Sequence, residues 1–599
     1  MVVPTPPLAV RDRTTAMKGA LRNLDPAHLI GAVPVALAIA LGALLRLSDP
    51  LSTPVLPAED PFTHMVLVKE HLLTGTLDPL NPPGGLYPPG MHALVAALWT
   101  FTGVDLYQLV RFSPVLLGAL AMIGTAVLLW KHAGRVAAFV GTLAMALAPE
   151  LIHRTTMMAP TAVDLALLPF LFFALLEVLE GKLAWVGIAA PLAVFLVFAH
   201  PWLYGLLALT GVVFAVFALV LPWPTTRSPR LSSPGFAAAL AVVGGSLGLV
   251  LSTCAGFCGP GFGGILPYGN LFTMIAPLVL VLSFLPAVFL VVQSDNLERW
   301  LPERDAGPRP VWLRAGVSLV LALALVGVTW PALAGGLPLL VDPPRMLGWP
   351  LLGLAALAFV LLPFMAGRLA YLAGAIATAT YPLVMYNPLG SPYWPHRTVV
   401  YLGMGLVLLV GVAGGHFARW ARVAWEDHVA KPSPVQGALE RPVVAMAPVL
   451  LVAGSLGGAV FAGTPSHYAD GWYRLYEPCE MEAMHDVSEV AEQDPDAVVV
   501  GGDWRPAIVL SAVTENPDRV WYKETFWVDE RERKDAMTLA REEGQPLYVV
   551  EDRHLRNEHP DADASFLESE DWRVVDSWCS EEISPRHRVV LHELTGVQG

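Results

Sequence analysis

Glu59 and Asp60 form an acidic pair in a chain that is otherwise strongly apolar. The pair follows the first hydrophobic segment, where unsolvated carboxylates are costly, so these side chains should face water or a cation. A further carboxylate, Asp164, lies where a later apolar segment opens on the same predicted side. Two carboxylate positions facing one aqueous side of a helical bundle indicate a metal-dependent or base-dependent active site at the membrane surface.

Asp60 and Asp164 are candidate ligands of Mg²⁺ or Mn²⁺, with Glu59 as a further catalytic candidate, because these hard cations prefer carboxylate oxygens. One of the carboxylates could instead act as a general base. Other interpretations stay open. Asp164 could lie in the first turn of its helix and interact with the helix dipole, and Glu59 could be a solvated loop residue.

Several basic residues are expected on the same side of the membrane. Arg397, beside His396 at the head of a late span, could hold a phosphate through paired charge-assisted hydrogen bonds, or could be an interfacial arginine. Arg154 could contact phosphate or orient its loop. His64 could be a ligand or a proton carrier, or only hydrogen-bonded. His200 has the default interpretation of a residue in an interfacial aromatic belt.

Composition defines the class of protein in which these residues lie. Of 599 residues, 55% are hydrophobic and only 15% are charged, whereas soluble proteins carry roughly 25% charged residues. Apolar runs recur from Leu29 to Phe461, and runs of about 20 residues can cross a hydrocarbon core of about 30 Å. The basic residues are scattered through short loops, so no nucleic-acid partner is expected.

The positive-inside rule places the N-terminus, residues 1–27, in the cytoplasm and predicts an α-helical polytopic membrane domain over residues 28–463. About thirteen transmembrane helices alternate sides with the basic loops inside, which leaves residues 48–112 as a large first outer loop. Gly90–Phe101 is then an interfacial or partly inserted helix. The predicted spans are 28–47, 113–130, 136–150, 162–180, 184–199, 202–222, 235–253, 271–292, 312–334, 347–366, 369–386, 398–414 and 443–463.

Residues 464–599 read as an acidic α/β domain, which an odd number of spans places outside the cell. From Ser466 to Gly599 there are 31 acidic and 13 basic residues, a net charge of −18 that leaves +4 for the rest of the total of −14. Strands are predicted at 497–500, 520–523, 547–550, 572–575 and 588–592, with a helix at 529–543, which favours a parallel or mixed sheet. Outside the cell, Cys479 and Cys579 could form a disulfide, although the sequence alone does not fix the pairing.

Four segments carry a family resemblance. They are Asp60-Pro61-Phe62-Thr63-His64, Tyr87-Pro88-Pro89-Gly90, Ala148-Pro149-Glu150 through Arg154 to Asp164, and His396-Arg397. In their order and predicted sidedness they resemble motifs of the catalytic subunit of oligosaccharyltransferase, of the archaeal and bacterial single-subunit type. That family belongs to the GT-C class of polyprenyl-phosphate-sugar glycosyltransferases, so the resemblance implies a GT-C fold.

The sequence also departs from the family pattern. Asp164 is followed by Leu165 and Ala166, where the family has a second carboxylate two residues on. Only Val341-Asp342 corresponds to the family's later outer-loop motif. The acceptor-reading WWD motif is degenerate, and Gly501-Gly502-Asp503-Trp504-Arg505 stands in its place.

The resemblance implies transfer of a sugar or oligosaccharide, with inversion, from a polyprenyl-phosphate-linked donor to an acceptor on the outer face of the cell membrane. Protein asparagine is one candidate acceptor, and another protein, a glycan or a lipid is an alternative. A transporter or flippase for a lipid-linked sugar and a non-catalytic partner subunit that binds a glycan lipid stay open. The implied residues are catalytic Asp60, Asp164 and Glu59, donor-phosphate-binding Arg397, Arg154 and His396, and acceptor-binding Asp503 and Trp504.

Overall fold

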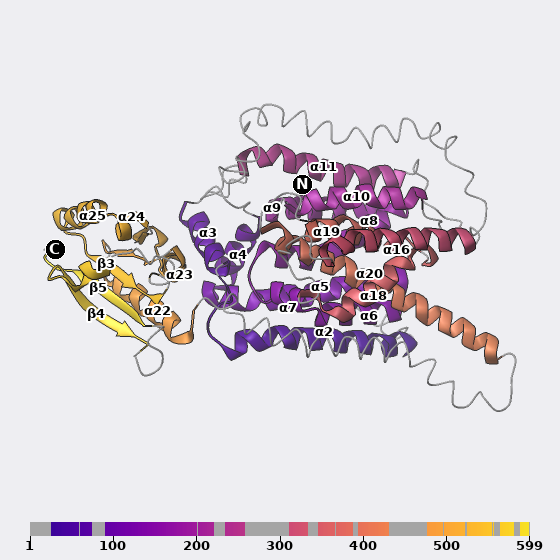
Figure 1. Ribbon diagram of the computed structural model, residues 1–599, viewed down its shortest axis with the longest axis horizontal. Helices are drawn as coiled ribbons and strands as arrows, with labels where there is room; N and C mark the ends of the chain where they lie inside the picture. Colours follow the sequence, from indigo (N-terminus) through magenta and orange to yellow (C-terminus); the bar gives the residue numbers. More distant parts are fainter. Residues whose placement is uncertain are drawn as a thin grey trace, which may run out of the picture.

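The computed structural model describes residues 26–58, 60–74, 90–200, 202–220, 234–257, 311–333, 346–365, 367–386, 393–429, 476–494, 496–502, 504–521, 524–553, 555, 564–579 and 588–597. These residues form a helical bundle and, at one end of it, a domain built on a β-sheet (Figure 1). We call the bundle end nearest the sheet the sheet-side end. The opposite bundle end is called the far end.

Six helices within the described ranges are long and apolar enough to cross a membrane. They are α2 (Pro26–Ser52), α5 (Leu106–Ala133), α8 (Pro160–Leu179), α16 (Val311–Leu333), α19 (Arg368–Tyr386) and α20 (Tyr393–Val429). Further apolar helices in the bundle are α6 (Arg135–Leu147), α9 (Val186–Ala199), α10 (Trp202–Val220), α11 (Pro234–Phe257) and α18 (Trp349–Val360). The predicted spans 271–292 and 443–463 lie outside the described residues, so the number thirteen stays a prediction.

Helix α20 is the centre of the bundle and packs against α6, α18 and α19. Small residues permit the α6–α20 contact. A Cβ atom at Gly411 would lie 3.1 Å from both the Ala137 carbonyl oxygen and the Gly141 Cα. Because an apolar membrane interior provides little hydrophobic force between helices, such close backbone approach is a main source of helix association.

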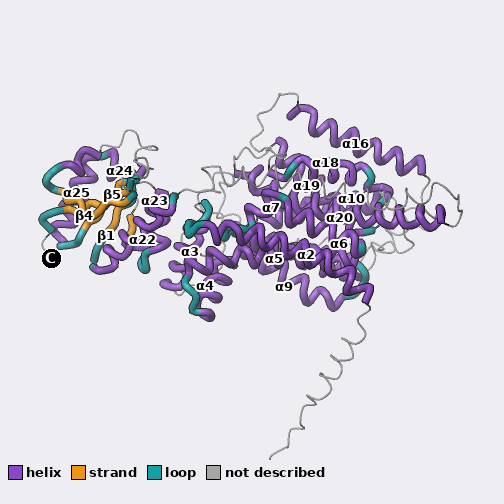
Figure 2. The backbone as a smooth tube through the Cα atoms, turned by 90° about the horizontal axis from the view of Figure 1, so that it is seen from below, coloured by secondary structure: helices purple, strands orange, loops and turns teal. Residues whose placement is uncertain are grey.

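Helices α3 (Asp60–Thr74) and α4 (Gly90–Thr102) lie between the bundle and the sheet domain, as both backbone views show (Figures 1 and 2). Phe62 of α3, Met91 of α4 and Met484 of the sheet domain belong to one buried apolar cluster. Lys69 of α3 donates hydrogen bonds of 2.5 Å to the carbonyl oxygens of Ala512 and Thr514 in the sheet domain. Helices α3 and α4 therefore join the two parts of the molecule.

The sheet contains β1 (Val498–Val500), β2 (Val520–Trp521), β3 (Leu547–Glu551), β4 (Trp572–Trp578) and β5 (Val589–Leu594), in the order β2-β1-β3-β5-β4. β1 pairs in parallel with β2 and β3, whereas β5 pairs antiparallel with β3 and β4. Each of the five predicted strands overlaps one of these, and the sheet is mixed. The helices around it are α22 (Pro478–Gln493), α23 (Trp504–Val513), α24 (Glu524–Val528) and α25 (Glu530–Glu543).

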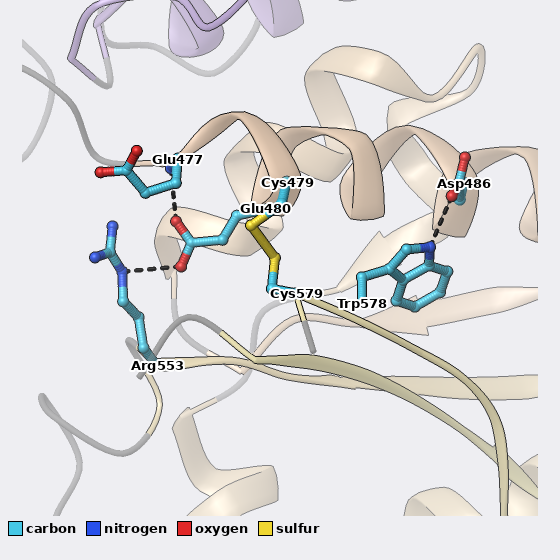
Figure 3. Close-up of a disulfide and its surroundings, with 7 residues drawn as sticks. All are labelled: Glu477, Cys479, Glu480, Asp486, Arg553, Trp578 and Cys579. Atoms are coloured by element: carbon cyan, nitrogen blue, oxygen red, sulfur yellow. Dashed lines mark hydrogen bonds and ion pairs between the residues drawn. A yellow bond between two sulfur atoms is a disulfide. The ribbon is translucent and has the colours of Figure 1, made fainter. Parts of the chain in front are cut away.

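A disulfide between Cys479 and Cys579 joins the first turn of α22 to the residue after β4 (Figure 3). Their Cα atoms are 5.6 Å apart, so the pairing considered from the sequence is present. Near the disulfide, Trp578 Nε1 donates a 2.7 Å hydrogen bond to Asp486, and Arg553 forms a 3.0 Å ion pair with Glu480. Covalent and polar contacts therefore fix α22 on the sheet.

Cys479→Ser should weaken the sheet domain substantially. The disulfide joins residues 100 positions apart, and loops of that size lose about 4 kcal/mol of stability without their cross-link. Amides of β5 that exchange by opening of the domain should exchange about 1,000-fold faster, as hydrogen-exchange mass spectrometry can measure. Reductant should accelerate exchange in the wild type but not in the variant. Exchange in Cys479→Ser as slow as in the oxidised wild type would contradict this prediction.

Candidate functional site

Asp164 is the buried centre of a polar group at the sheet-side end of the bundle. Its helix, α8, begins at Pro160, and the Asp164 side chain is fully buried. One carboxylate oxygen, Oδ2, lies 2.5 Å from His200 Nδ1 and accepts a hydrogen bond from the Tyr401 hydroxyl. The other, Oδ1, is buried and has no hydrogen-bond partner among the described residues. Hydrogen-bonding partners thus fix Oδ2 of Asp164, whereas Oδ1 could still accept a hydrogen bond or bind a cation.

This geometry corrects two expectations. Asp164 does not face water, and the first turn of α8 holds no acidic residue, so capping of the dipole does not account for Asp164. His200 is not an interfacial belt residue, because it is only 6% exposed and faces Asp164. A buried carboxylate without a partner is costly, and His200 at the end of α9 provides that partner.

Tyr401 was not identified from the sequence. It lies four residues after Arg397, and residues four apart occupy the same face of a helix. The charges of Arg397 and Arg154 both act on the Tyr401 hydroxyl. Both predicted phosphate-binding arginines are therefore close to the Asp164 group. The spacing of Tyr401 from Arg397 was the available signal, but tyrosines also occur in other apolar helices of the chain, such as Tyr371 and Tyr381 in α19.

The two arginines differ in their surroundings. Arg154 ends α7 (Pro149–Arg154), is buried, and its Nε donates a 2.8 Å hydrogen bond to Glu150 one turn earlier. Arg397 is only partly buried. Arg154 is thus fixed by a carboxylate, whereas Arg397 retains access to the surface of the bundle.

A group of buried histidines in α3 and α4 borders the Asp164 group. His64 Nδ1 of α3 and His92 Nε2 of α4 are 3.0 Å apart, and the His71 ring centroid lies 5.7 Å from that of His92. Burial above all, and the charges of Arg397 and His200, together lower the pKa of His64 to about 3. His64 is therefore neutral at pH 7 and close to both Arg397 and His200.

The neutral state of His64 should make stability depend on pH. Its pKa is about 3 when folded and 6.5 in the unfolded reference, so the unfolded chain binds more protons between these values. Stability should fall as the pH drops from 6.5 towards 3, by up to about 1.4 kcal/mol per pH unit. Thermal unfolding between pH 4.5 and 7 should show this slope in the wild type and a smaller one in His64→Gln. Equal slopes in both proteins would contradict the assignment.

Asp60 begins α3, is half-buried, and has no hydrogen-bond or ion-pair partner within the ranges that the structure describes. Phe62 and Val163 belong to one large apolar cluster that also includes Val589 of the sheet domain. Carboxylate oxygens such as those of Asp60 and Asp164 suit a hard divalent cation, and binding of one ion by this pair stays a prediction.

Gly90 explains how α4 reaches this region. A Cβ atom there would lie 2.6 Å from the Phe198 carbonyl carbon and 2.8 Å from the Ala199 nitrogen. Only glycine permits so close an approach of α4 to the end of α9, which directly precedes His200.

Four of the predicted site residues are not placed. Glu59 and Asp503 lie outside the described residues, as do the side chains of His396 and Trp504. Asp342 lies outside as well. Their predicted roles therefore stay predictions.

A cavity of about 810 Å³ lies between α3, α4, the start of α5 and the sheet domain. Trp99 and Tyr107 contribute aromatic surface, and the Tyr107 ring meets the His485 ring edge-on at 5.5 Å. Its charged lining residues are Lys69, Asp105, Arg111, Glu482 and Glu515. The cavity is large enough for a sugar unit or a short peptide.

No known family model matches the sequence, and no curated protein matches it in a sequence search. Solved structures do match the fold. The apo oligosaccharyltransferase of Archaeoglobus fulgidus aligns with 88% of this chain and 70% of its own, at a TM-score of 0.59 and 13% identity. The same archaeal enzyme, AglB, with an inhibitory peptide and a dolichol-phosphate covers the same shares at a TM-score of 0.54 and 13% identity. Its complex with Zn and sulfate aligns with 87% of this chain and 68% of its own, at a TM-score of 0.52 and 16% identity.

The chain therefore shares the fold of this archaeal oligosaccharyltransferase, as the resemblance of its motifs implied. Its apolar helices are those of a multi-pass membrane protein.

Proposed function

We propose that this protein is a membrane glycosyltransferase that transfers a sugar or oligosaccharide from a polyprenyl-phosphate-linked donor to an acceptor. The observation that carries the proposal is the position of Asp164, with Arg154 and Arg397 close to its partner Tyr401, at the sheet-side end of the bundle. Carboxylates and arginines in one site suit a reaction in which a phosphate leaves and a nucleophile loses a proton. The fold shared with an archaeal oligosaccharyltransferase supports the same class.

In the proposed reaction the acceptor's nucleophilic atom attacks the anomeric carbon, and the bond from that carbon to the donor phosphate breaks with inversion. Arg397 would hold the leaving phosphate by charge-assisted hydrogen bonds, since it is the more accessible of the two arginines. Arg154, fixed by Glu150, would add positive charge without moving. Asp60 would take the proton from the acceptor, because its carboxylate is half-exposed.

Asp164 would act from a fixed position. His200 and Tyr401 both contact its Oδ2. These two contacts fix the orientation of the carboxylate and therefore the position of Oδ1. If the enzyme uses Mg²⁺ or Mn²⁺, Asp60 and Oδ1 of Asp164 would hold the ion, with Glu59 as a further ligand. Such an ion would supply charge neutralisation for the leaving phosphate.

The acceptor is proposed to approach through the cavity beside the sheet domain. Trp99 and Tyr107 offer flat apolar faces, while Glu482 and Glu515 offer acceptors for hydroxyl or amide protons. Protein asparagine and a glycan are both candidate acceptors for such a lining. Asp503 and Trp504 stay the proposed residues for reading the acceptor, in place of the family's WWD motif.

The site is proposed to face the outside of the cell membrane, with the N-terminus in the cytoplasm and the sheet domain outside. The disulfide in the sheet domain supports this sidedness, because disulfides persist in oxidising compartments. The transporter and partner-subunit alternatives could use the arginines to bind a lipid phosphate, but neither needs a catalytic carboxylate beside them.

A deletion strain tests the proposal. Surface glycoproteins and lipid-linked sugars would be profiled by mass spectrometry after complementation with wild-type protein or Asp60→Ala. We expect a glycan to disappear from its acceptor on deletion, its lipid-linked precursor to accumulate, and Asp60→Ala to fail to restore transfer. Full rescue by Asp60→Ala would remove the catalytic role of this carboxylate and favour the transporter or partner-subunit alternative.

A further inference from the structure

A second polar group lies at the far end of the bundle, outside the proposed active site. It consists of His132 in the last turn of α5 and Glu177 and Glu180 at the end of α8. Helix α5 has 28 residues, which at about 1.5 Å per residue gives a length of about 42 Å. Its other end carries Tyr107, which contacts His485 of the sheet domain. On α8, Glu177 follows Asp164 of the proposed active site by 13 residues, so the two groups lie about 20 Å apart along that helix.

The oxygens of the two glutamates divide into two sets. Lys182 Nζ donates to Oε2 of Glu177, and lies 3.1 Å from Oε2 of Glu180. The Oε1 atoms face the imidazole instead: Oε1 of Glu177 is 3.8 Å from His132 Nε2, and Oε1 of Glu180 is 3.8 Å from Nδ1. These separations are too long for hydrogen bonds.

Two of these atoms are buried without a hydrogen-bond partner in the part of the chain that the structure describes. They are His132 Nε2 and Glu177 Oε1, whose side chains are only 9% and 3% exposed. Leaving one such buried polar atom unpaired costs about 1–3 kcal/mol. Two unpaired atoms that face each other at 3.8 Å suggest a missing common partner.

We propose that His132, Glu177 and Glu180 bind a divalent transition-metal ion of the Zn²⁺ type. One ligand atom from each residue lies within 4.8 Å of the other two, close to the span of about 4 Å that bonds of about 2.0–2.2 Å to one ion would give. An imidazole nitrogen with two carboxylate oxygens suits Zn²⁺ better than Mg²⁺, which prefers oxygen ligands alone.

The surroundings fit a bound ion. Lys182 on the Oε2 atoms would orient the ligating carboxylates, as hydrogen-bonded neighbours of metal ligands commonly do. The Phe173 ring meets the His132 ring edge-on at 5.6 Å, and Trp185 meets Phe173 at 5.1 Å. These aromatic rings fix the imidazole, so the ion would join the far ends of α5 and α8.

The competing interpretation is an ion-pair network in which Lys182, together with the charge of Arg368 that acts on Glu180, balances the glutamates. It accounts for both Oε2 atoms. It leaves His132 Nε2 and Glu177 Oε1 buried and unpaired, which the bound ion explains.

Metal titration of the full-length protein in detergent tests the proposal. The purified protein would carry no histidine tag and would be stripped of metal with a chelator. It would then be titrated with Co²⁺, whose visible absorption reports four-coordinate binding. We expect one such site in the wild type and at least ~100-fold weaker binding in His132→Gln or Glu177→Gln. His416→Gln, a histidine change in α20 outside the cluster, and Asp60→Asn, in the proposed active site, should both retain the signal.

Absence of Co²⁺ binding in the wild type, or unchanged binding in folded His132→Gln, would overturn the proposal. Zn²⁺ should also raise the Tm of the wild type and not that of His132→Gln. If both cluster variants fail to fold, X-ray absorption of the Zn²⁺-loaded wild type decides. One imidazole with oxygen ligands supports the site, and two or more imidazoles or none contradict it. Because sugar transfer is not the readout, this outcome is independent of the proposed function.

Discussion

Asp164→Ala should abolish sugar transfer and also weaken the membrane domain. The change removes the partner of both His200 and Tyr401, which lie buried around the carboxylate. His200 Nδ1 also lies 2.8 Å from the Tyr401 hydroxyl, so these two side chains can still pair with each other. The change should then leave one buried polar group unsatisfied, at a cost of about 1–3 kcal/mol. Transfer should fall by about 10²–10³-fold or more, the usual range when a fixed charge or donor is removed from an active site. Thermal unfolding and donor turnover in detergent would measure the two effects.

Asp164→Asn is the matched control that separates these effects. Its amide oxygen still accepts a hydrogen bond, so stability should stay within about 1 kcal/mol of the wild type. The negative charge is lost, so transfer should remain reduced by about 10²-fold. If Asp164→Asn transferred sugar at the wild-type rate, Asp164 would be a structural residue and not part of the active site.

Arg397→Met should lower kcat/KM for the lipid-linked donor by about 100-fold while leaving the fold intact. Arg397 is partly exposed and its charge reaches the Tyr401 hydroxyl beside Asp164. Loss of one charge-assisted contact to a leaving phosphate is expected to cost about 2.7–4 kcal/mol in the transition state. Donor turnover at several donor concentrations would measure the change.

Two variants control for this effect. Arg397→Lys keeps the charge but loses the planar pair of donors, so it should recover only part of the activity. Arg419→Met removes an arginine from the same helix at the far end, where it donates to the Ala133 carbonyl oxygen. Arg419→Met should turn over donor at nearly the wild-type rate. Equal losses in Arg397→Met and Arg419→Met would indicate damage to α20 and not to a phosphate site.

Much of the fold could be predicted because the helices of the bundle are long, continuous apolar segments of the sequence. The predicted span 162–180 corresponds to α8, 369–386 to α19 and 312–334 to α16. Helix 529–543 was predicted with its start one residue early, because Asp529 is the N-cap whose side chain accepts from the Arg531 and Glu532 amides. The periodicity and length of apolar segments therefore identify helices and strands well. The exact first and last residues are less predictable, because a capping residue can look like part of the helix.

The candidate site was harder to predict because its contacts are long-range. Asp164 and Tyr401 are 237 residues apart in sequence, and nothing local distinguishes Tyr401 from other tyrosines in apolar helices. His200 was interpreted by its position at a span end, where belt residues are common. Only the packing of α8, α9 and α20 shows that it faces a buried carboxylate.

The measurement that tests the central claim most directly is cleavage of the donor by purified protein reconstituted in liposomes. Lipid-linked sugars extracted from native membranes would be supplied with an extract of surface glycoproteins from the deletion strain. We expect the wild type to release polyprenyl phosphate and glycosylate an acceptor, and Asp60→Asn to do so at least ~100-fold more slowly. A wild-type protein that moved the intact lipid-linked sugar across the bilayer without cleaving the sugar–phosphate bond would contradict the account.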